Sequence, residues 1–216
     1  MDPKINHAES FAARVNRLDT SNKIARANSI NSSSKMISDP DTRSAFNNSI
    51  YNQKNETSTD GMTPLKFREK YKKQFIFGHL NVNSFRWKFY EASNELLSNH
   101  VMDLAFFSES KLDSSFPPGQ FSVPGFRDPP FRADRNKHGG GLIAYIRSDI
   151  PNRRRYDIER LFYDRIEVIA LEITLRNEKW LFVGFYKPPD IQNDCLIKSF
   201  ENVLNTNRSE FVCVSF

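Results

Sequence analysis

The sequence predicts a mixed α/β fold in which strands dominate the middle of the domain. Two apolar runs of strand length, residues 74–80 and 103–107, flank a segment with helical spacing at 86–98. Further strand-like segments follow up to residue 186, and a helix-like segment and a last apolar run come after them. A β-α-β unit followed by more strands and another α-β pair is typical of layered α/β domains.

The N-terminal segment differs in composition from the rest of the chain. Hydrophobic residues make up 38% of the 216 residues, and their shortage falls in residues 1–62, which are rich in Asn, Ser and charged side chains. Such a segment cannot bury enough apolar surface to offset the entropy it loses on folding. We therefore expect a disordered tail, in which the helical spacing of Phe11, Val15 and Leu18 allows one short helix.

Residues 63–73 are predicted to form a basic linker helix. Thr63 is a suitable N-cap, and Pro64 suits the first helical position. The simpler interpretation is a solvated helix that connects the tail to the domain. The alternatives are an arm that contacts phosphates and a nuclear-import signal.

The later elements follow from their patterns in order. Residues 139–147 combine a glycine turn with a strand, and the turn lacks the lysine pattern of a phosphate-binding loop. Residues 166–175 and 180–186 are strands joined by a polar turn, which predicts a hairpin. Residues 194–204 have apolar side chains on one helical face, and residues 210–216 begin one more strand.

Charge and cysteine content narrow the class of protein. The net charge of +5 is compatible with a polyanionic partner without requiring one. Cys195 and Cys213 are too few for a disulfide framework, and no apolar stretch is long enough to span a bilayer. The N-terminus lacks a secretory pattern. We expect an intracellular protein that is not secreted and has no membrane partner.

Polar side chains follow the first two predicted strands at the points where they end. Asn81 and Asn83 follow one strand, and Glu109 follows the next. A β-α-β unit brings both strand ends to the same edge of a sheet, where open α/β sheets hold their ligands. A carboxylate beside two carboxamides offers the oxygen ligands that a hard cation prefers. This pattern indicates metal-assisted phosphate chemistry.

Four short motifs, taken in order, resemble the endonuclease/exonuclease/phosphatase superfamily. They are His-Leu-Asn-Val-Asn-Ser at 79–84, Phe-Ser-Glu-Ser-Lys-Leu-Asp at 107–113, Gly-Gly-Gly-Leu-Ile-Ala-Tyr-Ile-Arg at 139–147 and Gly-Phe-Tyr-Lys-Pro-Pro at 184–189. The branch that they resemble most is the endonuclease domain of LINE-like non-LTR retrotransposons, which accompanies a reverse transcriptase. The resemblance covers residues 75–216. It implies a four-layer αββα sandwich and hydrolysis of DNA phosphodiesters with Mg²⁺ or Mn²⁺, and therefore a nuclear location.

The resemblance also implies roles for individual residues. Glu109 matches the family's metal-binding glutamate, and Asn83 would add a direct or water-mediated contact to the metal. Asn81 matches the asparagine that holds neighbouring groups in register. Tyr186 matches a tyrosine that reaches the scissile phosphate. The sequence departs from the family at Lys187, where Arg is more usual, and at Ser110, where Thr is common.

A larger departure lies at the end of the chain. The family's next strand closes in a Gly-Asp-Phe-Asn-type motif, and a catalytic histidine lies beyond it. Residues 211–215 resemble only the strand that leads into that motif, and none of the four histidines, His7, His79, His100 and His138, matches the catalytic one. We therefore expect the N-terminal part of the sandwich, truncated and inactive as it stands, with one sheet face bare.

Simpler interpretations of the same residues stay open. Glu109 alone would be a strand-end carboxylate that faces water, and Tyr186 a ring buried at a strand end. Asn81 and Asn83 alone would be turn-formers, because Asn tolerates turn geometry.

Two other functions compete with DNA hydrolysis. Arg153, Arg154 and Arg155 would contact DNA phosphates in a non-catalytic nucleic-acid-binding remnant, together with the basic residues of 66–73; their default interpretation is a solvated loop. A phosphoesterase of the same superfamily with another substrate is the second alternative.

Overall fold

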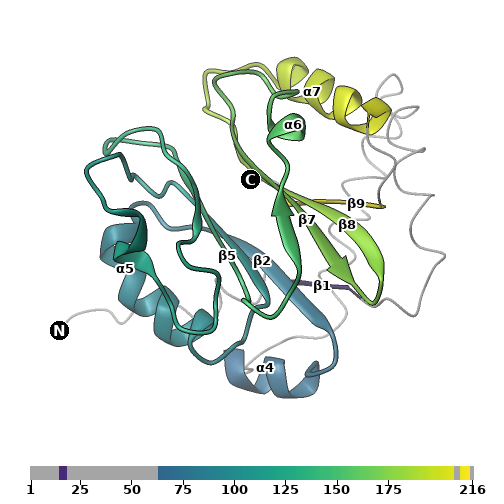
Figure 1. Cartoon of the computed structure of the whole chain (residues 1–216). Coiled ribbons are helices and arrows are strands. Elements are labelled where there is room, and N and C mark those ends of the chain that lie inside the picture. Colours follow the sequence, from purple (N-terminus) through teal and green to yellow (C-terminus); the bar gives the residue numbers. More distant parts are fainter. Residues whose placement is uncertain (1–14, 19–62, 207–209, 215–216) are drawn as a thin grey trace, which may run out of the picture.

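Two β-sheets form the centre of the molecule in the computed structural model, which describes residues 15–18, 63–206 and 210–214 (Figure 1). In the described residues the first sheet has five strands, in the order β1 (Val15–Leu18), β2 (Phe75–Asn81), β3 (Leu104–Ser108), β5 (Leu142–Ile146) and β4 (Phe131–Ala133). Strands β2 and β3 run parallel, and the other neighbours are antiparallel.

The second sheet has four strands in the described residues, in the order β6 (Asn152–Arg154), β7 (Glu167–Leu175), β8 (Glu178–Tyr186) and β9 (Glu210–Val214). Strands β7 and β8 form the predicted hairpin, whose two turn residues, Arg176 and Asn177, have φ angles of 50° and 67°. These left-handed values are typical of the type I′ turn that matches the twist of antiparallel strands. Strand β9 adds to β8 in parallel.

Helices cover the outer face of each sheet (Figure 1). The first sheet carries α4 (Pro64–Lys70) and α5 (Phe85–Ala92), which a π-helical turn extends through Ser93–Leu97. The second sheet carries α6 (Tyr156–Glu159) and α7 (Asn193–Thr206). No helix in the described segments combines the length and apolar character that crossing a membrane requires.

Among the described residues, three apolar clusters fill the spaces between these four layers. Successive side chains of a strand point to opposite faces, so each central strand contributes to two clusters. In β3, Phe106 packs between the sheets, whereas the next residue, Phe107, packs under α5. In β8, Phe182 packs between the sheets and Val183 under α7. The order of layers is therefore αββα, as the resemblance implies, and the mixed α/β prediction is confirmed.

The expectation of a bare sheet face is wrong for the described part of the chain. Side chains of α7 and of the loop before β7 cover the outer face of the second sheet, and Phe162, Phe185 and Val203 are buried there. The sequence pattern of residues 194–204 predicted the helix, but not that its apolar face would complete this third cluster.

Most of the predicted tail lies outside the described residues. The exception is Val15–Leu18, which forms β1 and pairs antiparallel with β2, with Leu18 opposite Phe75. The expectation of a short helix is therefore wrong for these four residues, because pairing with the edge of β2 favours an extended backbone. Phe11 lies outside the described residues.

Helix α4 lies within the segment 63–73, where the basic helix was predicted. The Thr63 side chain accepts a hydrogen bond from the backbone N–H of Lys66 at 3.3 Å, and Pro64 is the first helical residue. The helix is not merely a solvated connection, since Phe67 and Tyr71 pack against the cluster under the first sheet.

Candidate functional site

The two polar strand ends lie side by side, as the β-α-β pattern predicted. Asn81, the last residue of β2, pairs with Ser108, the last residue of β3. The loops that follow stay in contact, because the backbone N–H of Ser84 donates to the Glu109 carbonyl at 2.7 Å and that of Phe85 to the Ser110 carbonyl at 2.9 Å. Glu109 is thus fixed beside the turn that contains Asn81 and Asn83.

The backbone of these loops is strained. Asn83, Ser84, Glu109 and Lys111 have φ angles of 45°, 96°, 55° and 53°. Residues other than glycine adopt such values at a cost on the order of 1 kcal/mol each, and they keep them only where surrounding contacts enforce them. Strained residues of this kind gather at functional sites.

The glycine turn before β5 supports the Glu109 loop from the other side. The backbone N–H groups of Ser110 and Lys111 donate to the carbonyls of Gly141 and Gly140 at 3.2 and 3.0 Å. A Cβ on Gly141, whose φ is 85°, would lie 2.5 Å from the Ser110 Oγ. The turn therefore has the structural role that its sequence predicted.

The second sheet contributes Tyr186 to the same edge. The Tyr186 hydroxyl donates a hydrogen bond to the Glu109 carboxylate. Burial, and then this hydrogen bond and the charge of Glu109, raise the pKa of Tyr186 to about 12. The phenol therefore remains a protonated donor throughout the neutral range. The structure brings together Glu109 of the second sequence motif and Tyr186 of the fourth, which lie far apart in the chain.

Glu167 is a site residue that the sequence reasoning missed. It is the residue opposite Tyr186 in the β7–β8 pair. Its side chain is 10% exposed, its Oε1 lies 3.4 Å from a guanidinium nitrogen of Arg135, and its Oε2 is buried without a hydrogen-bond partner in the described structure. Burial raises the pKa of Glu167 to about 7; Arg135 opposes this shift, and the charge of Glu109 adds to it.

The two asparagines have structural contacts of their own. The Asn81 Oδ1 accepts a hydrogen bond from the backbone N–H of Asn83 at 3.1 Å, which makes Asn81 a turn-former as well as a neighbour of Glu109. The Asn83 Oδ1 accepts a hydrogen bond from the Lys111 ammonium group. Both side chains are exposed at the rim of the edge.

A divalent cation fits the donors at this edge. Mg²⁺ is held by one or two carboxylates and keeps several waters, and all its ligands are oxygens. Glu109 and Glu167 supply two carboxylates from different sheets, and the orphaned Oε2 of Glu167 is an acceptor that lacks a donor. A group of three or more His, Cys, Asp or Glu side chains with ligand geometry does not occur in the described residues.

Arg153 and Arg154 of β6, and Arg155 after them, are not brought to this edge. Arg153 pairs with Glu172, Arg154 with Glu159, and Arg155 with both Asp157 and Glu172. Arg153 also stands opposite Glu172 in the sheet, five residues along β7 from Glu167, which is about 17 Å at the usual rise of a strand. Each guanidinium is already bound to a carboxylate, so the structure gives no support to these side chains as the main phosphate contacts.

Comparisons with known proteins yield matches among solved structures alone, since no protein-family model and no curated protein matches the sequence. The chain is similar to the endonuclease domain of TRAS1, a telomere-specific non-LTR retrotransposon, at 14% identity and a TM-score of 0.42, over 64% of this chain and 56% of that one. It is similar to a humanized TDP2 of D. rerio at 11% identity and a TM-score of 0.39, over 63% and 62% of the two chains.

A third similar structure is the mannosyl-6-phosphatase Bt3783 of Bacteroides thetaiotaomicron, at 11% identity and a TM-score of 0.38, over 60% of this chain and 57% of that one. The chain thus spans less than two thirds of each of these structures. The αββα order of layers, established above from the clusters, is the order that the resemblance to the endonuclease/exonuclease/phosphatase superfamily implies.

Proposed function

We propose that the chain hydrolyses phosphate esters with a divalent cation held at the edge where the two sheets meet. The observation that carries this proposal is the convergence of Glu109 from the first sheet with Glu167 and Tyr186 from the second. Two carboxylates, one with an orphaned oxygen, and a protonated phenol form a set that suits a cation and a phosphate group together.

The residues have separable roles in this proposal. Glu109 and Glu167 would hold Mg²⁺ or Mn²⁺, which would supply polarisation of a phosphate oxygen when bound. Tyr186 would redirect its single O–H from the Glu109 carboxylate to a non-bridging oxygen and so orient the phosphate. Asn81 fixes the turn beside Glu109, and the Asn83 carboxamide offers one more oxygen at the rim.

Arg135 adds a positive charge to this site. Its guanidinium, 35% exposed, lies between solvent and the buried Glu167 carboxylate. The Arg135 guanidinium would attract the phosphate group of a substrate and would stay paired with Glu167 between turnovers.

DNA is the substrate that we propose, and a nuclear location follows from it. The support comes from the Lys-Leu-Asp segment after Ser110 and the Lys-Pro-Pro segment after Tyr186, which resemble the retrotransposon branch, and from the net charge of +5.

The test combines cation binding with hydrolysis. Mn²⁺ binding to the full chain, followed by electron paramagnetic resonance, is expected to weaken at least about tenfold in Glu109→Gln and in Glu167→Gln, because each variant removes a charged ligand. Glu201→Gln, an exposed carboxylate on α7, is the matched control and is expected to bind as the wild type does. A Mn²⁺ affinity that is unchanged in both Glu109→Gln and Glu167→Gln would overturn the proposed cation site.

Hydrolysis is then measured under single-turnover conditions with supercoiled plasmid, a generic phosphodiester and a generic phosphomonoester. Any cleavage is expected to require Mg²⁺ and to fall about 10²-fold or more in Tyr186→Phe and Glu109→Gln. Cleavage that persists in EDTA contradicts the proposal. Cleavage of the monoester alone would assign another substrate to the site, and salt-sensitive DNA binding without a cation site would favour the non-catalytic alternative.

A further inference from the structure

A pocket of about 330 Å³ lies at the opposite end of the sheets from the candidate site. Its lining includes Phe75 at the start of β2 and Leu175 at the end of β7, whereas Glu109 follows the far end of β3 and Glu167 begins β7. Eight residue steps of β7 separate Glu167 from Leu175, or about 27 Å at the usual strand rise. The pocket is therefore separate from the candidate site.

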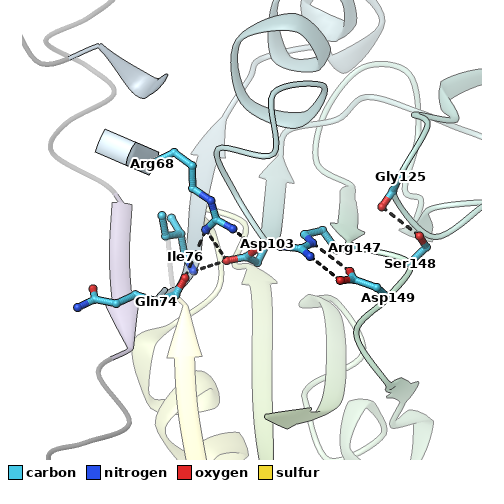
Figure 2. A network of polar contacts seen from close by, with 8 residues as sticks. All are labelled: Arg68, Gln74, Ile76, Asp103, Gly125, Arg147, Ser148 and Asp149. Carbon is cyan, nitrogen blue, oxygen red and sulfur yellow. Dashed lines mark hydrogen bonds and ion pairs between the residues drawn. The ribbon is translucent and has the colours of Figure 1, made fainter. Parts of the chain in front are cut away.

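The acidic side chains of this pocket are already paired, as Figure 2 shows. Asp103, which is 3% exposed, accepts two hydrogen bonds from Arg68 at 2.9 Å, one from Arg147 at 2.8 Å and one from the backbone N–H of Ile76 at 2.7 Å. Asp149 is bound to the same Arg147. Neither carboxylate has a charge left to neutralise further cations.

Three other cations line the pocket without such partners. Lys72 and Lys73 come from the segment between α4 and β2, and Arg176 comes from the β7–β8 turn. All three are exposed, and in the described structure none makes a hydrogen bond or an ion pair. Five cationic residues thus face two acidic ones around this pocket, which leaves a positive excess that attracts anions.

Another part of the pocket lining is apolar. Phe75, Ile150, Pro151 and Leu175 form this part, and the Phe75 ring is held at 5.4 Å from the ring of Phe182. A volume of about 330 Å³ falls at the lower end of the range for small-molecule sites, roughly 300–1,000 Å³. Unpaired cations next to an apolar wall suit a small ligand with a phosphate and a flat, weakly polar part.

We propose that this pocket binds a nucleoside monophosphate. Lys72, Lys73 and Arg176 hold the phosphate, and the base lies against Phe75 and Leu175. Arg176 has a φ of 50° in a turn position where Gly or Asn is usual. Its place there puts an exposed guanidinium in the lining of the pocket. This inference does not depend on the proposed hydrolytic function.

The test is calorimetric titration of the full chain with AMP in EDTA, so that no cation can occupy the candidate site. The variant K72A/K73A/R176A is expected to bind AMP at least about tenfold more weakly, because it loses charge-assisted contacts to the phosphate. The control K66A/R160A/K198A removes the same charge from exposed positions outside the pocket lining and is expected to stay within about twofold of the wild type. Equal losses in both variants would show that only net charge matters and would overturn the proposal.

Two further ligands and a map of the contact complete the test. The proposal requires both the cations and the apolar wall to contribute to AMP binding. It would be overturned if adenosine or inorganic phosphate bound as tightly as AMP. It would also be overturned if the wild type did not bind AMP. On AMP addition, amide chemical shifts are expected to move at 72–76, 147–151 and 174–177. Shifts confined to 81–84 and 109–111 would place the ligand at the candidate catalytic edge instead. Thermal unfolding of both triple variants is expected to match the wild type, since the replaced side chains are exposed.

Discussion

The environment of Glu167 disfavours the ionised form of its carboxyl group. Its side chain is almost fully buried at the junction of the two sheets, and one of its oxygens has no hydrogen-bond donor in the described structure. The ion pair with Arg135 compensates only in part, and so the pKa of Glu167 rises from 4.5 to about 7. Such a group binds its proton more tightly in the folded chain than in the unfolded chain.

This raised pKa predicts how stability depends on pH in EDTA. The stabilisation from protonated Glu167 is complete below pH of about 4.5 and is lost as the pH rises through about 7. Glu167→Gln keeps a neutral side chain at every pH. The variant is therefore expected to match the wild type near pH 4.5 and to exceed its free energy of unfolding by about 2–3 kcal/mol at pH 8. Urea unfolding at several pH values measures this, and a pH-independent difference would contradict it.

The sequence could identify only part of this site. The strand-end pattern placed Asn81 and Glu109 together, because their neighbourhood follows from one β-α-β unit. Predicting Glu167 as a site residue requires the register of the hairpin. With Arg176 and Asn177 as the turn, counting back along both strands places Glu167 opposite Tyr186. Arg135 lies in an irregular loop whose course no local pattern encodes, and for that reason it was not predictable.

At the scale of elements, the buried carboxylate of Asp103 links a helix to one strand of the first sheet and to the residue that follows another. Asp103 binds Arg68 of α4, the backbone of β2 and Arg147, the residue after β5. Its own backbone also pairs with Ile76 and Arg147. The cap at Thr63 made α4 predictable from the sequence, but the partner of Arg68 lies 35 residues further along the chain and is not a local signal.

Removing this carboxylate is expected to be costly. Asp103→Ala leaves two guanidinium groups and a backbone N–H without their acceptor, and we expect a loss of about 3–5 kcal/mol in the free energy of unfolding. Asp149→Ala, which breaks an exposed pair with the same Arg147, is the control, with an expected loss of about 0–1 kcal/mol. Chemical denaturation compares the two variants. A loss at Asp103 no larger than that at Asp149 would show that the network does not hold these elements together.

At the scale of the whole molecule, the spacing between the sheets is set where Gly184 meets Phe106. A Cβ on Gly184 would lie 2.2 Å from the Phe106 ring, so that only glycine lets β8 approach β3 this closely. Tyr186 follows two residues later and reaches Glu109 across the same gap. The layered fold was predictable from the order of elements, whereas this spacing depends on one contact between distant segments.

Gly184→Ala is expected to push the sheets apart. We expect a loss of about 1–3 kcal/mol in the free energy of unfolding from overpacking, together with weaker Mn²⁺ binding at the proposed site. Phe106→Leu in the same chain should restore part of both losses, because it removes ring atoms that the new methyl group would meet. Gly119→Ala, where the nearest atom would be 3.6 Å away, is the control, with an expected change within about 0.5 kcal/mol. Equal effects at the two glycines would contradict this account.

The pairing of β1 with β2 has a consequence for any shortened form of the chain. Val15–Leu18 caps the outer row of N–H and C=O groups of β2, from Phe75 to Gly78. A version that starts at residue 63, where the composition changes, would leave that row open to pairing with another molecule, and open sheet edges of this kind promote aggregation. By covering the edge of β2, Val15–Leu18 therefore protects the chain against self-association.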